Sequence, residues 1–246
     1  MQRKLKTAYL VLTSVLLYLF HLPIALAKSA TGSRFIPDAS DSVRKVSSKT
    51  LASARSVYDS LRLDVAGLSR QAYDYALRGF DKLLAQGKLL NDSILTIADF
   101  SQPSRNKRLY IIDLKNQKVL FNTWVAHGKN SGLDRTVSYS NQHSSLQSSP
   151  GFYITRGTYF GSNGYSLRLD GMERGINDNA MERAIVMHGA DYVSQSFINA
   201  RGFIGRSWGC PAVSQREAAP IINTLKGGSC LFIYSPSYVS RSPILN

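Results

Sequence analysis

Apolar residues recur at intervals of three and four positions between about residues 40 and 98. This spacing is typical of an amphipathic helix, and it is clearest after Ser69, whose side chain can cap a helix start. Gly87 fits the position just past a helix end, so the sequence predicts a helix from Ser69 to about Gln86. The predicted buried stripe consists of Tyr73, Ala76, Leu77, Phe80, Leu83 and Leu84. The stretch 41–61 is also predicted to be helical.

From Leu95 onward, short apolar runs alternate with Gly, Ser and Asn turns, a pattern typical of strands. The predicted strands are Leu95–Phe100, Arg108–Leu114, Lys118–Ala126, Gly151–Phe160, Tyr165–Leu169, Ala184–Met187 and Ser229–Tyr234. Residues 115–117 are predicted to form a hairpin turn, and 128–148 a long polar loop of functional interest. We therefore expect an α+β protein, with a leader and α-helical region over 28–98 and a β-rich sandwich or barrel over 101–246.

The first 27 residues have the three-part layout of a secretory signal peptide. A basic start with Arg3, Lys4 and Lys6 precedes the apolar run Ala8–Phe20 and the small-residue site Ala25–Ala27. The apolar run is shorter than the roughly 20 residues of a membrane-spanning helix, and no later run is long enough to span a bilayer. The sequence therefore predicts export to the periplasm or to the cell wall and extracellular space, without an integral membrane segment after cleavage.

Composition and charge narrow the class of partner. Of the 246 residues, 43% are hydrophobic, so a sizeable core can form. The chain carries 30 Lys and Arg residues against 16 Asp and Glu residues, a net charge of +14. For an exported protein, an anionic wall polymer or lipid surface suits this charge better than nucleic acid, which we do not expect as a partner.

Cys210 and His188 are candidates for a nucleophile and its base. Cys210 follows a tight turn at Gly209, and His188 ends the apolar run Ile185–Met187. A histidine within hydrogen-bond reach can deprotonate a thiol and later protonate a leaving amine. A structural alternative is open at this point, because an exported chain with two cysteines can join them in a disulfide, here Cys210–Cys230.

No metal site and no cofactor are predicted. Two cysteines cannot supply a Cys-rich zinc site, and His127, His143 and His188 lack the spacing of zinc ligands. Acyl transfer by a thiol and an imidazole requires neither a metal nor an organic cofactor.

The cysteine and the histidine lie in longer motifs. His188-Gly189 is followed by Ser207-Trp208-Gly209-Cys210, and upstream come Val125–Gly128 and Ser149–Tyr153. Together these motifs resemble the signature of the L,D-transpeptidase catalytic-domain (YkuD-like) family, in which a His-Gly pair precedes Ser or Thr, any residue, Gly and Cys. The resemblance covers about residues 105–235 and is greatest to a bacterial subgroup of murein L,D-transpeptidases.

The resemblance implies an exported enzyme that acts on peptidoglycan stem peptides. It makes Cys210 the nucleophile and His188 its base, with the Gly189 carbonyl orienting the imidazole. The amides of Gly209 and Cys210 would form an oxyanion hole, and Ser207 would brace the turn or the substrate. Cys210 would displace the terminal D-alanine of a tetrapeptide stem. The resulting thioester would pass to an amine of another stem, of a wall-linked lipoprotein lysine or of a free D-amino acid, or to water.

Three departures from the family pattern concern the substrate site. Trp208 stands where the family often has His, Ala212 stands where it usually has Arg, and Pro150 runs directly into Gly151 without the usual spacer. Arg206 is a candidate to supply the missing cation. The predicted substrate-binding residues are Arg206, Trp208, His127 and Tyr192.

Three alternative functions remain open on the sequence. The first is a peptidoglycan hydrolase, an L,D-carboxypeptidase or an endopeptidase or amidase, using the same Cys–His pair. The second is a sortase-type transpeptidase in which Arg216 supplies the arginine, although the Ser-x-Gly-Cys turn argues against it. The third is a non-catalytic wall-binding protein stabilised by a Cys210–Cys230 disulfide.

Overall fold

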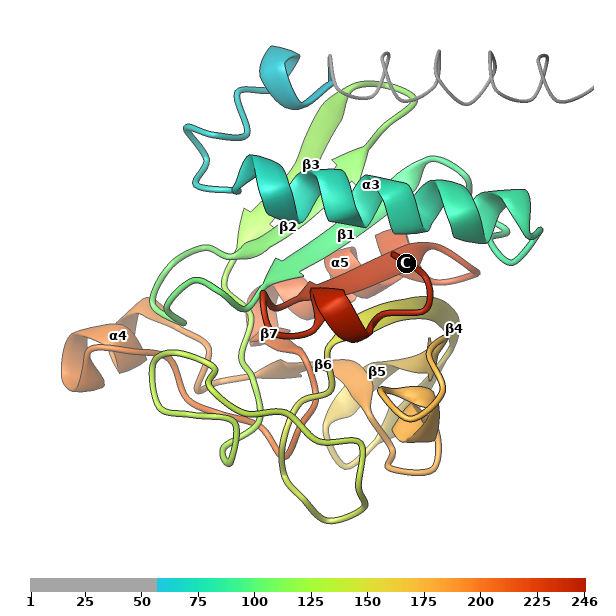
Figure 1. The fold of residues 1–246 in the computed structure, drawn as a ribbon. Helices are drawn as coiled ribbons and strands as arrows, with labels where there is room; N and C mark the ends of the chain where they lie inside the picture. Colours follow the sequence, from blue (N-terminus) through green and yellow to red (C-terminus); the bar gives the residue numbers. More distant parts are fainter. Residues whose placement is uncertain (1–56) are drawn as a thin grey trace, which may run out of the picture. The chain divides into compact units, whose positions relative to one another are not determined.

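The computed structural model describes residues 57–246 of the chain (Figure 1). Its helices and strands, in chain order, are α3 (Arg70–Ala85), β1 (Ile94–Asp99), β2 (Leu109–Asp113), β3 (Lys118–Thr123), β4 (Gly151–Gly161), β5 (Gly164–Gly171), β6 (Val186–Ala190), α4 (Gln195–Arg201), β7 (Ala212–Ser214), α5 (Gln215–Leu225) and β8 (Cys230–Tyr234). Residues 57–60 are helical, at the end of the helix predicted over 41–61. The rest of that helix, the signal peptide and the leader lie outside the described residues.

Helix α3 forms where the apolar spacing predicts it. The Ser69 hydroxyl caps its start by accepting a hydrogen bond from the Ala72 amide at 3.1 Å. Gly87 follows the helix end with a φ of +66°, a conformation that glycine adopts at little cost. The predicted stripe is buried except for Leu84, which is 37% exposed. Across residues 57–246, no helix has both the length and the apolar character that a membrane span requires.

Within the described residues, eight strands form one mixed sheet in the order β3-β2-β1-β8-β4-β5-β6-β7. The pairs β1–β8 and β6–β7 are parallel, and the other neighbours are antiparallel. The seven predicted strands are confirmed, with ends shifted by a few residues. The prediction missed α4, α5 and β7, because β7 has only three residues and α5 contains Pro220, a residue that normally breaks a helix.

The two edges of the sheet meet. Ala126, just after β3, donates its amide hydrogen to the Ala212 carbonyl of β7 at 2.8 Å. This bridge brings the first and last strands of the sheet order together, so the sheet is a nearly closed barrel. The prediction of a β-rich sandwich or barrel accompanied by helices is confirmed.

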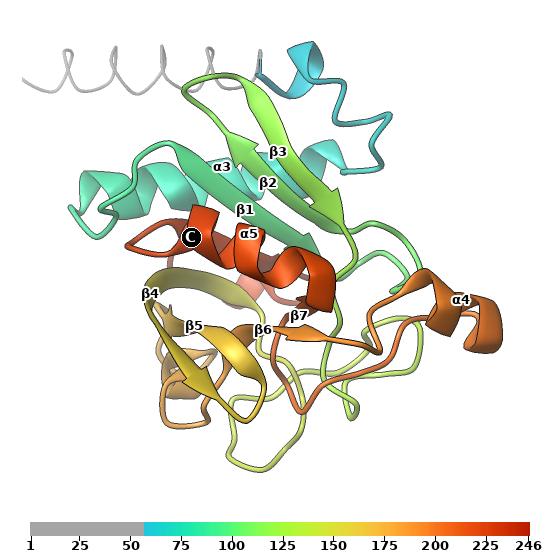
Figure 2. The same ribbon diagram turned by 180° about the vertical axis from the view of Figure 1, so that it is seen from behind.

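The central strands are buried on both faces. Successive residues of a strand point to opposite sides of the sheet, and here each side meets a hydrophobic core. In β8, the side chains of Cys230 and Phe232 belong to the core beneath α3, whereas Leu231 and Ile233 belong to the core that includes residues of α5. Helix α3 covers one face of the sheet in Figure 1, and α5 lies on the opposite face in Figure 2. Two separate cores therefore sandwich the middle of the sheet.

The described part of the helical segment and the β-rich segment, residues 57–246, belong to one compact unit. The sequence predicted that the β-rich domain begins at residue 101, after the helical region that ends at residue 98. In the structure, strand β1, which precedes residue 101, lies inside the sheet between β2 and β8. Helix α3 packs directly on β1 and β8, so its apolar stripe is part of the core of the sheet. The described part of the helical region is thus a layer of the β-rich fold.

Candidate active site

Cys210 lies at the end of a tight turn that leads into β7. Gly209 has a φ of +124°, which favours glycine, and a Cβ at this position would approach the Gln147 carbonyl to 2.8 Å. The Ser207 hydroxyl braces the turn from inside. It accepts a hydrogen bond from the Gly209 amide at 3.1 Å and donates one to the Cys210 carbonyl at 2.6 Å. This is the bracing role that the family resemblance gives to Ser207.

His188 lies on β6, the strand that pairs with β7. The parallel register places His188 opposite Ala212, two residues after Cys210, so the pairing brings the histidine and cysteine segments together. The His188 Nδ1 lies 2.8 Å from the Gly189 carbonyl, which can only accept a hydrogen bond. Nδ1 therefore carries the proton, and Nε2 keeps a lone pair that can receive a proton from a thiol.

A cavity of about 450 Å³ opens beside this pair and is lined by both Cys210 and His188. Four other predicted site residues also line it, namely Ser207, Arg206, Trp208 and Tyr192. The rest of the lining comes from the β4–β5 turn and from residues 183–185, just before β6. The whole lining includes two arginines, Arg183 and Arg206, and no carboxylate, so the cavity suits a ligand that carries negative charge.

Burial sets the resting protonation of the pair. Cys210 is 9% exposed, and burial raises the pKa of its thiol, an effect that the Val186 amide and the Arg183 charge partly offset. Burial lowers the pKa of the His188 imidazole, which the hydrogen bond to the Gly189 carbonyl partly offsets. Both shifts favour the uncharged forms, so at neutral pH the pair rests as a thiol beside a neutral imidazole.

The resting thiol has its own hydrogen-bond partners. The Val186 amide donates to Sγ at 3.5 Å, and Sγ donates to the Ala184 carbonyl at 3.6 Å. No hydrogen bond within residues 57–246 joins Sγ to His188. Transfer of the thiol proton to the imidazole therefore requires the thiol to give up its hydrogen bond to the Ala184 carbonyl.

The hydrogen bonds of the turn narrow the choice of oxyanion-hole donors. The sequence proposed the amides of Gly209 and Cys210, but the Gly209 amide is already donated to the Ser207 hydroxyl. The Cys210 amide has no acceptor among the described residues. Of the two amides proposed for the oxyanion hole, the Cys210 amide is therefore the one left free, and Gly209 contributes through its left-handed backbone.

His127 lies outside the cavity, contrary to its predicted role in substrate binding. Its side chain is fully buried, and its Nδ1 accepts a hydrogen bond at 2.7 Å from Arg108, which is also fully buried. Burial, together with the Arg108 charge, lowers the pKa of His127 to about 3. The His127 carbonyl accepts a hydrogen bond from the Ser207 amide at 2.9 Å, so His127 supports the catalytic turn from behind.

The other predicted substrate contacts face the cavity with different amounts of freedom. Trp208 lies at the edge of the cavity and is 74% exposed, with the Lys129 ammonium 5.8 Å from its ring centre. The Arg206 Nη1 donates hydrogen bonds to the carbonyls of Lys129 and Gly132, both at 3.0 Å. Its Nη2 and Nε make no hydrogen bond within residues 57–246. Burial is the main factor that raises the pKa of Tyr192 to about 12, so its hydroxyl stays protonated.

Two sequence alternatives conflict with the structure. Cys210 and Cys230 are both free thiols and belong to the two separate cores, so the predicted disulfide alternative is wrong. Arg216 is exposed on α5 and does not line the cavity, which removes the basis for a sortase-like arginine.

Ala212, where the family usually has Arg, is fully buried between β6 and Ala126, with no room for a long side chain.

Arg183 lines the cavity although the sequence analysis did not select it. It lies five residues before His188 and had no motif to distinguish it from other arginines.

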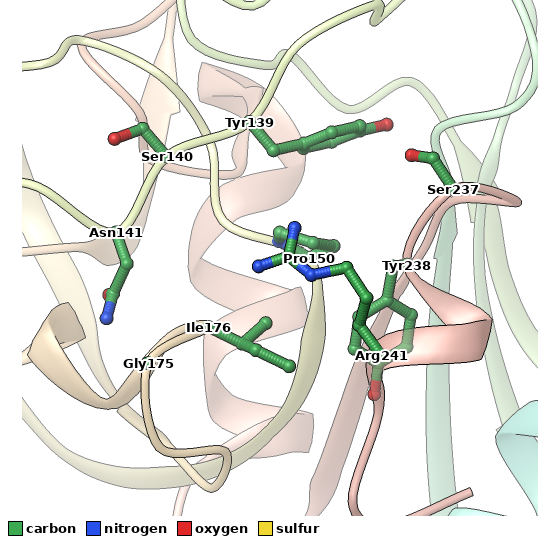
Figure 3. A pocket seen from close by; sticks show the side chains of 9 residues that line it. All are labelled: Tyr139, Ser140, Asn141, Pro150, Gly175, Ile176, Ser237, Tyr238 and Arg241. Carbon is green, nitrogen blue, oxygen red and sulfur yellow. The ribbon is translucent and has the colours of Figure 1, made fainter.

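A second, smaller hollow of about 100 Å³ lies elsewhere (Figure 3). It is lined by Tyr139–Asn141 of the polar loop, by Pro150, Gly175 and Ile176, and by residues near the C-terminus that include Arg241. It contains neither Cys210 nor His188. Within residues 57–246, no three His, Cys, Asp or Glu side chains cluster as a metal site.

The structure is thus a nearly closed β-rich barrel in which a cysteine in the turn before β7 and a histidine on the neighbouring strand β6 line one cavity. The chain belongs to the L,D-transpeptidase catalytic domain family, whose sequence model matches residues 64–234, more than half of the chain. No curated protein sequence matches.

Several solved structures are similar to the chain. L,D-transpeptidase LdtMt1 in complex with imipenem is 15% identical, with 58% of this chain and 59% of that chain covered and a TM-score of 0.36. An L,D-transpeptidase from Mycobacterium smegmatis is 13% identical, with 58% and 59% covered and a TM-score of 0.36. One from Stackebrandtia nassauensis is 13% identical, with 68% of each chain covered and a TM-score of 0.35. The match thus spans less than two thirds of the first two of these chains.

Proposed function

We propose that this protein is an exported cysteine L,D-transpeptidase that modifies peptidoglycan. The observation that carries the proposal is the shared cavity of Cys210 and His188, in which the imidazole presents an unprotonated Nε2. Membership of the L,D-transpeptidase catalytic domain family supports the reaction class. The signal peptide predicted from the sequence supports export, and the excess of positive charge suits an anionic wall.

The reaction begins with proton transfer from the Cys210 thiol to the His188 Nε2. The Sγ then attacks the carbonyl that links the third residue of a tetrapeptide stem to its terminal D-alanine. The Cys210 amide donates a hydrogen bond to the developing oxyanion. The C–N bond breaks, the imidazolium protonates the leaving D-alanine amine, and a thioester remains on Cys210.

The second half-reaction returns the thiol. An acceptor amine attacks the thioester and its proton passes to the His188 Nε2. The C–S bond breaks to give a new amide, and the imidazolium returns the proton to the departing Sγ, which restores the Cys210 thiol. The amine belongs to a second stem, a wall-linked lipoprotein lysine or a free D-amino acid. Arg206, whose Nη2 and Nε make no hydrogen bond within residues 57–246, binds a carboxylate of the donor stem.

The test uses the protein without residues 1–27 and a synthetic tetrapeptide stem. Mass spectrometry is expected to show loss of D-alanine and an acyl adduct on Cys210, with a new amide product when an amine acceptor is added. Cys210→Ala should abolish both, and His188→Ala should slow them by at least about a hundredfold. Cys230→Ala is the matched control, since that thiol is buried on the other face of the sheet.

The products distinguish transfer from hydrolysis. A tripeptide as the sole product, even at high amine concentration, would make the protein an L,D-carboxypeptidase and contradict transpeptidation. Turnover that survives in Cys210→Ala would contradict the nucleophile itself. Export is tested separately, by N-terminal sequencing of the protein secreted by cells, which should begin at Lys28.

A further inference from the structure

Arg183 is bound to the polar loop that faces the catalytic turn. Its Nη1 donates to the Ser140 carbonyl at 2.8 Å and to the Ser149 hydroxyl at 2.5 Å. Its Nη2 donates to the Gln147 carbonyl at 2.6 Å and to the Ser145 hydroxyl at 3.2 Å. All four hydrogens of the two terminal nitrogens are thus committed to one loop, and the guanidinium acts as an anchor rather than as a ligand donor.

The anchored loop touches the turn that presents Cys210. Ser148 donates its hydroxyl to the Gly209 carbonyl at 3.1 Å, and the same hydroxyl accepts the Gly128 amide at 3.0 Å. The Gln147 carbonyl, which Arg183 holds, lies close to the Gly209 Cα hydrogen, since a Cβ there would approach it to 2.8 Å. The contacts therefore run from Arg183 through Gln147 and Ser148 to Gly209.

The backbone next to Arg183 contacts the thiol directly. Ala184 has a φ of +53°, a left-handed conformation that an alanine rarely adopts. Its carbonyl is the acceptor for the Cys210 thiol. A strained residue at a reactive group requires support from its surroundings, and the four hydrogen bonds of the adjoining Arg183 supply that support.

We propose that Arg183 is a positioning residue, which locks the loop 140–149 against the catalytic turn and so fixes the Cys210 amide and thiol for acyl transfer. This inference rests on the proposed function, because it assumes that Cys210 is the nucleophile. In this chain Ala212 stands where the family usually has Arg, and Arg183 brings a cation to the cavity from a different strand end.

The charges around the thiol are consistent with this role. The titratable groups lining the cavity are His188, Tyr192, Arg183 and Arg206. His188 and Tyr192 are neutral at physiological pH for the reasons given above. Arg206 is tied to carbonyls on the other side of the turn. Arg183 is the cation whose charge lowers the pKa of Cys210 against the effect of burial.

The experiment compares Arg183→Gln, Arg183→Lys and Ser148→Ala in the mature protein. Arg183→Gln removes both charge and anchor, so kcat should fall by about ten- to a hundredfold with KM nearly unchanged. The alkylation midpoint of Cys210 should move up by about one pH unit. Arg183→Lys keeps the charge but not the four hydrogen bonds. The alkylation midpoint should therefore return to that of the unaltered protein, while kcat stays low. Ser148→Ala should lower kcat without moving the midpoint.

Hydrogen–deuterium exchange of residues 140–149 reports the anchor independently of activity. Exchange should accelerate in both Arg183 variants and stay unchanged in Arg216→Gln, a control on the exposed surface of α5. Unchanged kcat, midpoint and loop exchange in Arg183→Gln, with turnover abolished in Cys210→Ala, would overturn the role of Arg183 and leave the proposed function standing. Turnover retained in Cys210→Ala would instead overturn the proposed function, and this inference with it.

Discussion

At the scale of single residues, burial decides how the catalytic pair rests. Cys210 and His188 are 9% and 4% exposed, and in both cases desolvation disfavours the charged form. The thiol proton is directed to the Ala184 carbonyl rather than to the imidazole. The pair therefore rests as two neutral groups.

The pH dependence of thiol alkylation tests this resting state. In the free protein, the rate of Cys210 alkylation should rise with pH, with a midpoint above the usual cysteine value of about 8.5, because burial raises the thiol pKa. His188→Ala should leave this midpoint nearly unchanged while it lowers turnover. A midpoint well below 8.5 that rises in His188→Ala would show a thiolate–imidazolium pair at rest and contradict the prediction.

His127 makes the fold sensitive to acid. Its pKa of about 3 in the folded protein lies below the roughly 6.5 of an exposed histidine, so the unfolded chain binds the proton more tightly. The stability that depends on neutral His127 is fully present above about pH 6.5 and declines toward pH 3. The free energy of unfolding should fall by up to about 1.4 kcal/mol per pH unit in that window.

Urea denaturation between pH 4 and pH 7.5 measures this slope. His127→Asn keeps an acceptor for Arg108 and does not titrate, so its pH dependence should be shallower. Equal slopes for the unaltered protein and His127→Asn would assign the acid sensitivity to other groups.

At the scale of elements, the close approach of α3 to the sheet depends on a glycine. A Cβ on Gly79 would lie 2.0 Å from Cζ of Phe152, which stacks on Phe232 with ring centres 4.2 Å apart. The apolar stripe of α3 indicated which face is buried. It did not indicate that a small residue on that face sets the distance between helix and sheet.

Gly79→Ala tests this contact. In an exposed helix the change would stabilise the protein by about 1 kcal/mol. Here overpacking against the stacked phenylalanines should instead lower the free energy of unfolding by about 1–3 kcal/mol. Urea denaturation measures the difference, with exposed Arg78→Ala on the same helix as a control expected to change it by less than about 0.5 kcal/mol. A stabilised Gly79→Ala would refute the tight contact.

At the scale of the whole molecule, the helical segment is part of the core that supports the active site. Strand β8 is held between β1 and β4, and its Cys230 and Phe232 side chains are covered by α3. The sheet in turn positions β6 and β7, which carry the site. We therefore expect the β-rich part to require α3 and β1 for stable folding.

Truncation tests that requirement. A fragment of residues 101–246 lacks α3 and β1, so the apolar face of β8 is exposed and the fragment should fail to fold cooperatively. A fragment of residues 57–246 should unfold in one cooperative transition. Circular dichroism with urea denaturation distinguishes the two, and a cooperatively folded 101–246 fragment would establish the helical segment as a separate addition.

The sequence by itself determined the local features: the α3 stripe, the strands, the Gly209 turn and the Cys210 and His188 motifs. These follow from residue spacing, backbone freedom and short motifs, which act over a few neighbours along the chain. The three-residue β7 and the proline-containing α5 were missed because their signals are short or contrary to propensity, and only pairing and burial stabilise them.

Only the tertiary structure decided which distant residues meet. His127 precedes a glycine much as His188 does, yet its partner is the buried Arg108, and this separates a structural histidine from a catalytic candidate. Arg183 carries no motif and gains its place through hydrogen bonds to a loop more than 30 residues away. Such contacts depend on the closure of the sheet, which brings together segments whose spacing along the chain carries no signal of their proximity.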